Sequence, residues 1–368
     1  MNDALSVAVL GAGGIIAPAI VKDLAESEEV ASMRLLDIDG ARAAEVAARH
    51  GAGRASAEAV DAREGLAAAL EGCDVLVNSA SYRVNLDAMG ACLEAGCNYI
   101  DLGGLYHVTD KQLDFHGAFE RAGLIAVLGI GSAPGKTNLM ALAAVRRLGG
   151  SAKAVHVAAA GRDPEAPPGL SLPYALRTLI DELTLPPVVV RDGRPVEVEP
   201  LSDGGVLDYG DPIGEAQTIY TLHSEPRTFP ESFGCSEASF RLSLSPALME
   251  RLRELVDASP EEVEAAQAGA QPASPKTHSV HVADATAADG RFVRVACITR
   301  PHEGWRLGGG VVSTASPAAA TVRLLARGEI EARGALPPER CIDPDDMFPE
   351  LERRGCEFRV EEREAVST

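Results

Sequence analysis

The stretch SVAVLGAGGIIAPAI, residues 6–20, determines the fold class that we expect for the first third of the chain. Residues 6–10 are an apolar run of strand length, residues 11–14 form a glycine-rich turn, and isoleucines follow at a helical spacing of four. A strand that turns through glycines into a helix presents the free N–H groups of the helix start to a phosphate. The candidate cofactor-binding residues of this turn are Gly11, Gly13, Gly14, Ile15 and Ile16.

An acidic residue follows the next apolar run. Residues 33–36 form a second predicted strand, and Asp37 ends it, 24 residues after Gly13. A carboxylate near this spacing accepts hydrogen bonds from a ribose diol and repels a 2′-phosphate, so NAD is favoured over NADP. Asp39 is an alternative for this role, and Arg42 keeps NADP possible. The third glycine of the usual G-x-G-x-x-G pattern is replaced by Ile16.

The alternation of short apolar runs and helical patterns continues to residue 129. Further strands are expected at 57–60, 74–78, 99–102 and 124–129, and helices at 41–50, 65–70, 86–95 and from Thr109 or Asp110 to 122. Six strands with helical crossovers describe a doubly wound parallel sheet of the Rossmann type. Ligands bind at the carboxyl ends of such strands, which adds Asp61, Asn78, Ser79 and Ala80 as cofactor candidates and Gly103 and Gly104 as substrate candidates.

Composition excludes several classes of protein. The 368 residues carry a formal net charge of −20, which repels a phosphodiester backbone and argues against nucleic acid as a partner. We find no apolar run long enough to cross a membrane and no secretory signal at the start of the sequence. The seven cysteines include no CxxC pair, which favours free thiols and a cytoplasmic location.

The pattern changes after residue 135. Proline-rich and glycine-rich stretches separate strand-like runs at 188–190, 279–283 and 292–298, with an expected exposed loop at 261–275. We predict an antiparallel α+β substrate domain at 136–311, inserted into a Rossmann domain formed by 1–135 and about 312–355. A helix at 316–327 is expected to pack on the Rossmann domain.

Two other ligand patterns fail on spacing. GIGSAPGKT, residues 129–137, resembles a phosphate-binding P-loop, but that motif needs a glycine at the position of Ile130. His278 and His281 are separated by three residues on a predicted strand, so they point to opposite faces and do not form a metal site.

Several motifs together resemble the saccharopine dehydrogenase-like family, and within it the lysine 6-dehydrogenase branch. They are GAGGII (11–16), LLDID (35–39), DVLVNSA (74–80), NYIDLGG (98–104), HVTD (107–110), SAPGKTN (132–138), SLPYALRTLID (171–181), HSEP (223–226) and RGALPPER (333–340). The resemblance implies a Rossmann domain interrupted by an α+β domain that mediates oligomerisation, in a homodimer or homotetramer. It also implies hydride transfer at a carbon that bears an amine.

Amine oxidation requires a group that takes up a proton and groups that hold the substrate. His107 follows the double glycine, and His223 with Glu225 would share one face of a strand. Asp101 is a candidate for an ammonium group, and the candidates for a carboxylate are Lys136 and Arg177. Tyr174 is a candidate for a hydroxyl contact.

Three functions remain open on the sequence. The first is an NAD-dependent dehydrogenase of an amino acid, with lysine as the default substrate. The second is an NAD(P)H-dependent reductase of an imine formed between an amino acid and an aldehyde. The third is an NAD(P)-binding regulator without catalysis.

Overall fold

The computed structural model describes residues 4–166, 171–172, 175–255 and 258–365. The chain divides into two compact units. One comprises Met1–Lys136 and Thr314–Leu351, and the other comprises Thr137–Ser313 and Glu352–Thr368. The second unit therefore lies between two segments of the first, and the chain enters it again at its end.

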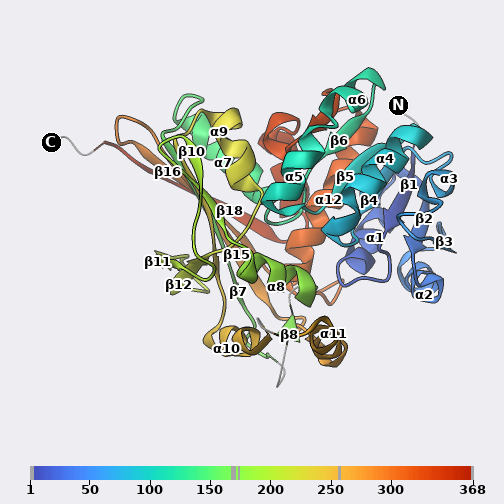
Figure 1. Cartoon of the computed structure of the whole chain (residues 1–368). Helices are drawn as coiled ribbons and strands as arrows, with labels where there is room; N and C mark the ends of the chain where they lie inside the picture. The colour runs from blue at the N-terminus through green and yellow to red at the C-terminus, as the bar shows by residue number, and fades with distance from the viewer. Residues whose placement is uncertain (1–3, 167–170, 173–174, 256–257, 366–368) are drawn as a thin grey trace. The chain divides into compact units, whose positions relative to one another are not determined.

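The first unit is built on a seven-stranded parallel sheet with the order β17-β6-β5-β4-β1-β2-β3 (Figure 1). Its strands are β1 (Leu5–Leu10), β2 (Val30–Asp37), β3 (Ala55–Ala59), β4 (Val75–Asn78), β5 (Asn98–Asp101), β6 (Ile125–Val127) and β17 (Gly334–Leu336). The predicted Rossmann-type fold and its six strands are confirmed. The seventh, β17, was not predicted because its three residues are too short to show a periodicity.

The order of the strands identifies the edge of this sheet at which ligands bind. β1 pairs with β2 on one side and with β4 on the other, so the direction of winding reverses beside β1. Residues 7–10 and 75–78 are buried as continuous runs, as expected for central strands that helices cover on both faces. The carboxyl ends of β1 and β4 therefore flank the crevice where ligands of such sheets bind.

The predicted helices of the first unit occur, but the helix expected up to residue 122 is divided into two, and η1, η2 and α13 were not predicted. They are α1 (Ala17–Ala25), α2 (Gly40–His50), α3 (Leu66–Ala69), η1 (Tyr82–Val84), α4 (Asn85–Ala95), α5 (Leu105–Leu113), α6 (His116–Arg121), α12 (Gly309–Arg327), η2 (Pro338–Arg340) and α13 (Pro344–Glu352). The prediction that Thr109 or Asp110 caps a helix is wrong, because both lie inside α5, which begins after Gly104. α12 packs on α1 through Arg323, which binds Asp23, as expected for the late helix.

The second unit contains a nine-stranded mixed sheet. Its main order is β10-β9-β13-β7-β15-β16-β18, and the β11–β12 hairpin joins it at β13. The strands are β7 (Ala154–Arg162), β9 (Val188–Arg191), β10 (Arg194–Glu197), β11 (Asp203–Asp208), β12 (Glu215–Tyr220), β13 (Glu237–Ser243), β15 (His278–Thr286), β16 (Phe292–Thr299) and β18 (Cys356–Arg363), with β8 (Ser171–Leu172) and β14 (Gln271–Pro272) in a separate pair. The helices are α7 (Lys136–Arg147), α8 (Leu176–Thr184), α9 (Glu225–Phe233), α10 (Pro246–Leu255) and α11 (Pro260–Gly269).

Two predictions for this unit are wrong. The sheet is not wholly antiparallel, because β13 pairs with β7 in parallel, and the long segment between them supplies the crossover that a parallel pair needs. The expected loop at 261–275 contains α11, which starts with a capping box between Ser259 and Glu262. The alanine- and glutamine-rich segment has no clear apolar face, so hydrophobic periodicity does not reveal this helix.

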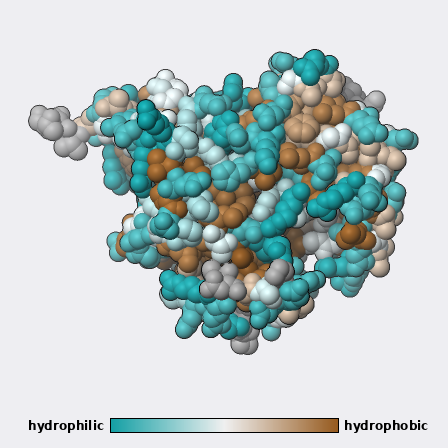
Figure 2. Space-filling model, in the orientation of Figure 1, coloured by the Kyte–Doolittle hydropathy of each residue, from teal (hydrophilic) through white to brown (hydrophobic). Residues whose placement is uncertain are grey.

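Figure 2 shows hydrophilic side chains over much of the visible face, with apolar groups among them. Among the helices of the described residues, none has the length and apolar character needed to cross a bilayer.

Candidate functional site

The glycine turn runs directly against the end of β4. Gly11 has a φ of +74°, and a Cβ added to it would lie 2.6 Å from the backbone nitrogen of Ala80. Its amide donates to the carbonyl of Leu36, which ties the turn to β2. Only glycine combines this backbone conformation with so close an approach, and the structure therefore requires Gly11.

Asp37 holds the turn from the neighbouring strand. The amide of Gly13 donates to its Oδ2 over 2.8 Å, and the amide of Asp39 donates to its Oδ1 over 2.9 Å. Asp39 is the N-cap of α2, where its carboxylate accepts from two helix amides. Of the two acidic candidates for the ribose, Asp37 is therefore the one that lies at the glycine turn, because the carboxylate of Asp39 caps α2.

A cation also lies beside the turn. A Cβ added to Gly13 would be 2.9 Å from Cβ and 3.5 Å from Nε of Arg42, and 3.2 Å from Oδ2 of Asp37. The side chains of Asp37 and Arg42 therefore both lie next to Gly13.

The start of α1 fits a dinucleotide phosphate. Ile16 is its N-cap residue and supplies no side-chain hydrogen bond, so the first amides of the helix are not capped by this residue. Ile16 itself is buried, which explains why an apolar residue replaces the third glycine. Ile15 and Ile38, in contrast, are 45% and 77% exposed, and Ile38 directly follows Asp37. Exposed apolar side chains in the glycine turn and next to Asp37 suit the flat face of an adenine ring.

A buried polar network holds the loops that follow β4 and β5. Asn78 donates to Asn85 over 2.9 Å and to the hydroxyl of Tyr99 over 3.1 Å. Asn85 in turn donates to Oδ2 of Asp101 over 3.2 Å. The amide of Ala80 donates to the side-chain oxygen of Asn78, which links the network to the residue that touches Gly11.

Asp101 is the centre of this network. Its Oδ1 accepts from the amides of Gly103 and Gly129, and its Oδ2 accepts from Gln112 over 2.5 Å. Burial raises the pKa of this carboxyl group, and the hydrogen bonds from Gln112 and the two amides act in the opposite direction. The prediction that Asp101 binds a substrate ammonium is not supported by this geometry, because the side chain is buried and its oxygens already face protein donors.

Replacing Asp101 by asparagine is expected to lower the free energy of unfolding by about 2–3 kcal/mol. An amide group would turn one N–H donor toward the donors that now surround the carboxylate. Denaturant unfolding measures the change, with the exposed Asp114→Asn as the matched control. Equal stability of the two variants would contradict the central role of Asp101.

The segment that resembles a P-loop is a closed turn. The amide of Gly131 donates to the carbonyl of Pro134, and the amide of Lys136 donates to the carbonyl of Gly131. Pro134 packs so tightly that a Cβ on Gly103 or Gly129 would lie within 2.9 Å of its ring. Glycine at position 103 therefore allows the loop after β5 to pack against Pro134. Lys136, at the end of the turn, is completely buried.

The other candidates of the first unit lie near the carboxyl edge of the sheet. Ser79 directly follows β4, and in the described part of the chain its buried Oγ has no hydrogen-bond partner. Asp61 follows β3 and accepts from the amide of Arg63. His107 is exposed in the first turn of α5, with its ring 5.3 Å from that of Tyr106.

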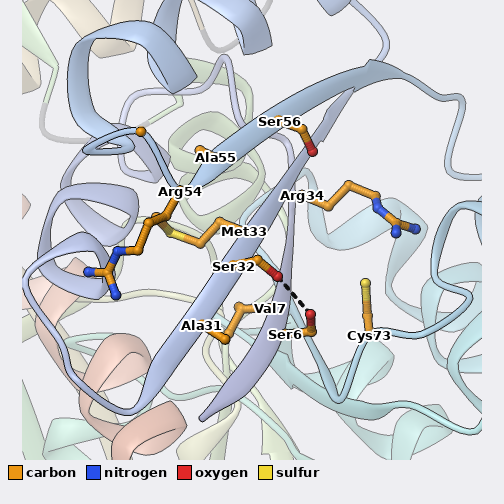
Figure 3. A pocket seen from close by; sticks show the side chains of 11 residues that line it. Ser6, Val7, Ala31, Ser32, Met33, Arg34, Arg54, Ala55, Ser56 and Cys73 are labelled. Carbon is orange, nitrogen blue, oxygen red and sulfur yellow. Dashed lines mark hydrogen bonds between the residues drawn. The ribbon is translucent and has the colours of Figure 1, made fainter.

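A cavity of about 470 Å³ lies at the opposite, amino-terminal edge of the same sheet (Figure 3). The hydroxyl groups of Ser6 and Ser32 are hydrogen-bonded there over 2.7 Å. Arg34 and Arg54 point away from each other and donate to backbone carbonyls of neighbouring segments. The cavity is therefore remote from the glycine turn, and its two cations do not converge.

In the second unit, His223 lies between two buried carboxylates. Its Nδ1 is 3.3 Å from Oε2 of Glu225, and its Nε2 is 3.7 Å from Oε2 of Glu182. The ring stacks on Phe240 of β13, with 3.5 Å between centroids. The predicted pairing of His223 and Glu225 occurs, but not on a strand, because Glu225 begins α9. Thr137 donates to Oε1 of Glu225 over 2.9 Å and fixes the carboxylate.

The two carboxylates determine the protonation of His223. Burial alone would lower the pKa of the imidazole, but Glu225 and Glu182 outweigh it and raise the pKa to about 9. At neutral pH the ring is therefore a buried imidazolium, which donates protons and cannot accept one.

Glu182 was not among the predicted site residues. It lies on α8, where Leu176, Leu179 and Leu183 form the buried face. An acidic residue on the apolar face of a helix is the pattern that would have identified it. The other candidate on α8, Arg177, is exposed, and Tyr174 lies outside the described residues.

Comparisons with known proteins agree with this geometry. Residues 7–127 match the family model described as the saccharopine dehydrogenase NADP binding domain. A curated relative, carboxyaminopropylagmatine dehydrogenase from Synechocystis sp., is 27% identical over 263 residues, which are 68% of this chain and 65% of the relative. The chain therefore spans about two thirds of the length of that protein. The structure of apo saccharopine dehydrogenase (L-Glu forming) from Saccharomyces cerevisiae has a TM-score of 0.72 at 14% identity and covers 98% of this chain and 100% of its own.

These matches agree with the resemblance for residues 7–127, which are similar to the nucleotide-binding domain of that family. The similarity to the yeast structure extends over both units and shows the fold.

Proposed function

We propose that this protein is an NAD(P)-dependent oxidoreductase that acts on a carbon–nitrogen bond of an amine. The hydrogen bond from Gly13 to Asp37, beside β1 where the winding of the parallel sheet reverses, carries the proposal. The uncapped start of α1 and the exposed Ile15 and Ile38 supply the surfaces for a pyrophosphate and an adenine. The similarity in sequence to carboxyaminopropylagmatine dehydrogenase supports the reaction class.

The proposed reaction balances in either direction. A hydride leaves the carbon that bears the amine, the nitrogen loses a proton, and a C=N bond forms while the nicotinamide is reduced. Hydrolysis of the imine by water then releases an aldehyde or ketone and an amine. The nicotinamide would supply only the hydride acceptor, so the chain itself must hold the substrate.

We propose an amino acid as substrate in the first instance, with lysine as the default. A second candidate is the reduction of an imine that joins an amine to an aldehyde. The similarity to carboxyaminopropylagmatine dehydrogenase, whose name contains an agmatine group, favours this second candidate. Absorbance of the reduced nicotinamide separates them, with lysine and saccharopine as donors in one direction and agmatine with an aldehyde as acceptors in the other.

Replacing Asp37 by alanine is expected to weaken NAD binding about tenfold or more, because charge-assisted hydrogen bonds to the turn and the ribose are lost. Replacing Arg42 by alanine is expected to weaken NADP more than NAD, since Arg42 is the cation beside the turn. Fluorescence titration with each reduced dinucleotide measures both changes.

Arg49→Ala is the matched control, because Arg49 is on the same helix and its side chain is 69% exposed. If Arg49→Ala weakens NADP binding as much as Arg42→Ala does, the effect comes from the net charge of the protein and not from a contact of Arg42 with NADP. If the wild-type chain binds neither dinucleotide, the interpretation of the glycine turn is wrong and the proposed function falls with it.

A further inference from the structure

Strand β18 (Cys356–Arg363) forms one edge of the sheet in the second unit. Within the residues that the structure describes, it is the last strand of the main order and pairs with β16 alone (Figure 1). All eight of its residues pair with β16 in one continuous register. A long, regular edge strand presents backbone N–H and C=O groups to which a strand of another molecule can add.

The other edge strands of this sheet have features that hinder such pairing. β10 contains Pro195, which has no N–H to donate. β11 has an irregular register with β12 between Asp203 and Gly205, and such irregularities keep an edge from pairing. The sequence of β18, CEFRVEER, contains neither proline nor glycine, so its regular edge is the one that suits a further strand.

The charged side chains of β18 alternate in sign along one face. The residues at every second position, which share a face of the strand, are Glu357, Arg359, Glu361 and Arg363. Two copies of β18 can be aligned antiparallel with Val360 opposite Val360. In this register Glu357 lies opposite Arg363 of the other copy, and Arg359 lies opposite Glu361. Each of the four charges then faces an opposite charge, and such cross-strand pairs stabilise a sheet.

The neighbouring registers are unfavourable. A shift of two residues in one direction brings Arg359 opposite Arg359, and a shift in the other direction brings Glu361 opposite Glu361. Like charges directly opposite each other destabilise a pair of strands, so the charge pattern selects the register centred on Val360. The side chain of Val360 is 45% exposed in the single chain, and this register packs it against its own copy. The strand is thus complementary to itself, as an interface with two-fold symmetry requires.

The charges at this edge are also balanced locally. The net charge of −20 makes two copies of the chain repel each other. Each carboxylate of β18, however, has an arginine beside it. The ion pairs are Glu357 with Arg300 and Arg359, Glu361 with Arg363, and Glu362 with Arg147. Two copies can therefore approach each other along β18 with little repulsion.

We propose that two copies of this chain associate through β18 about a two-fold axis at Val360, which joins their two sheets into one. Backbone hydrogen bonds between the two β18 strands and the cross-strand ion pairs hold the copies together. The pairs within one strand are exposed, which leaves the charged groups accessible to the other copy. The inference concerns the second unit alone and does not depend on the proposed function.

Sedimentation velocity over a series of concentrations tests the proposal. The wild-type chain is expected to form dimers. Arg359→Glu sets like charges opposite each other at both Glu361 positions of the dimer and should weaken association about tenfold or more. Glu361→Arg should have a similar effect, because it sets an arginine opposite each Arg359. A wild-type chain that remains monomeric up to about 100 µM would show that the charges of β18 only protect its edge and would overturn the proposal.

A mixture of the two single variants gives the sharpest test. In a dimer of one Arg359→Glu chain and one Glu361→Arg chain, every charge on this face of β18 again lies opposite an opposite charge. The mixture should therefore form dimers with an affinity near that of the wild type, whereas each variant alone should be largely monomeric. Roles confined to one chain predict no such rescue, because each variant has lost an ion pair within its own strand. A mixture that stays monomeric would overturn the assigned register.

Cysteine substitution measures the register directly. Val360→Cys places two thiols opposite each other at the axis, so mild oxidation with copper phenanthroline should join two chains through a disulfide. Glu357→Cys is the control, because its two copies would lie six residues, about 20 Å, apart along the strands. The wild-type chain, whose cysteines are free and mostly buried, measures the background. Equal cross-linking of the two substituted chains would contradict the axis at Val360.

Arg251→Glu is the matched control for the charge substitutions. It changes the net charge of the chain as Arg359→Glu does, and it breaks an exposed pair with Glu254 on α10. Its association should equal that of the wild type; equal weakening by the two variants would assign the effect to net charge and overturn the role of β18. Because the pairs of β18 are exposed, unfolding at a protein concentration that keeps the chain monomeric should be nearly the same for these variants.

Discussion

Replacing Arg323 by methionine is expected to lower the free energy of unfolding by about 3–5 kcal/mol, the cost of breaking a buried ion pair by removing one partner. The guanidinium donates to Oε2 of Glu350 over 2.7 Å, to Oδ1 of Asp23 over 2.9 Å and to Ser27. Asp23 is completely buried and Glu350 nearly so. Methionine would remove this cation from two buried carboxylates, of which Glu350 keeps its contact with Arg327. Denaturant unfolding of the first unit, followed by hydrogen exchange in α12, measures the loss.

Arg359→Met is the matched control for this prediction. Arg359 pairs with Glu357 on β18, and the side chains are 54% and 42% exposed. An exposed pair contributes about 0–1 kcal/mol, so this variant should be nearly as stable as the wild type. The triple variant Arg323→Met, Asp23→Asn, Glu350→Gln should recover part of the loss, because the uncompensated charges are gone. No difference between Arg323→Met and Arg359→Met would contradict the buried ion pair.

The second unit is expected to lose stability as the pH rises from 6.5 to above 9. The folded pKa of His223, about 9, lies above the ordinary value of 6.5, so protonation favours the folded state. The stabilisation is complete below pH 6.5 and disappears as the pH passes the folded pKa. A difference of this size corresponds to about 3 kcal/mol. Hydrogen exchange at α9, measured between pH 6.5 and 9.5 and corrected for intrinsic exchange, reports the change.

The variant His223→Gln separates this effect from other groups that titrate at high pH. It should be less stable than the wild type at pH 6.5, and the difference between the two proteins should shrink as the pH rises. Glutamine removes the charge but keeps a polar side chain between Glu182 and Glu225. A constant difference across this range would show that His223 is neutral when folded and would contradict the ion cluster.

The cofactor half of the site could be predicted because its determinants are local or strongly patterned. An apolar run, a glycine turn and a helix start lie within residues 6–20, and Asp37 ends the next apolar run. The hydrogen bond between Gly13 and Asp37 then follows from the pairing of adjacent parallel strands. The roles of Asp101 and Asn78 could not be predicted, because a polar residue at a strand end looks the same whether it binds a ligand or the protein's own amides.

The sequence by itself determined the Rossmann-type sheet and its glycine turn, and it suggested that His223 lies near Glu225, although on a strand where the structure has the start of α9. Each depends on hydrophobic periodicity, on the backbone freedom of glycine or on residues close in the chain. The tertiary structure alone decided that Glu182 joins this pair, that Asp101 is enclosed by donors and that β13 lies parallel to β7. These features join segments far apart in the chain, and whether a polar group faces solvent, a ligand or a buried partner is decided by which segments pack together.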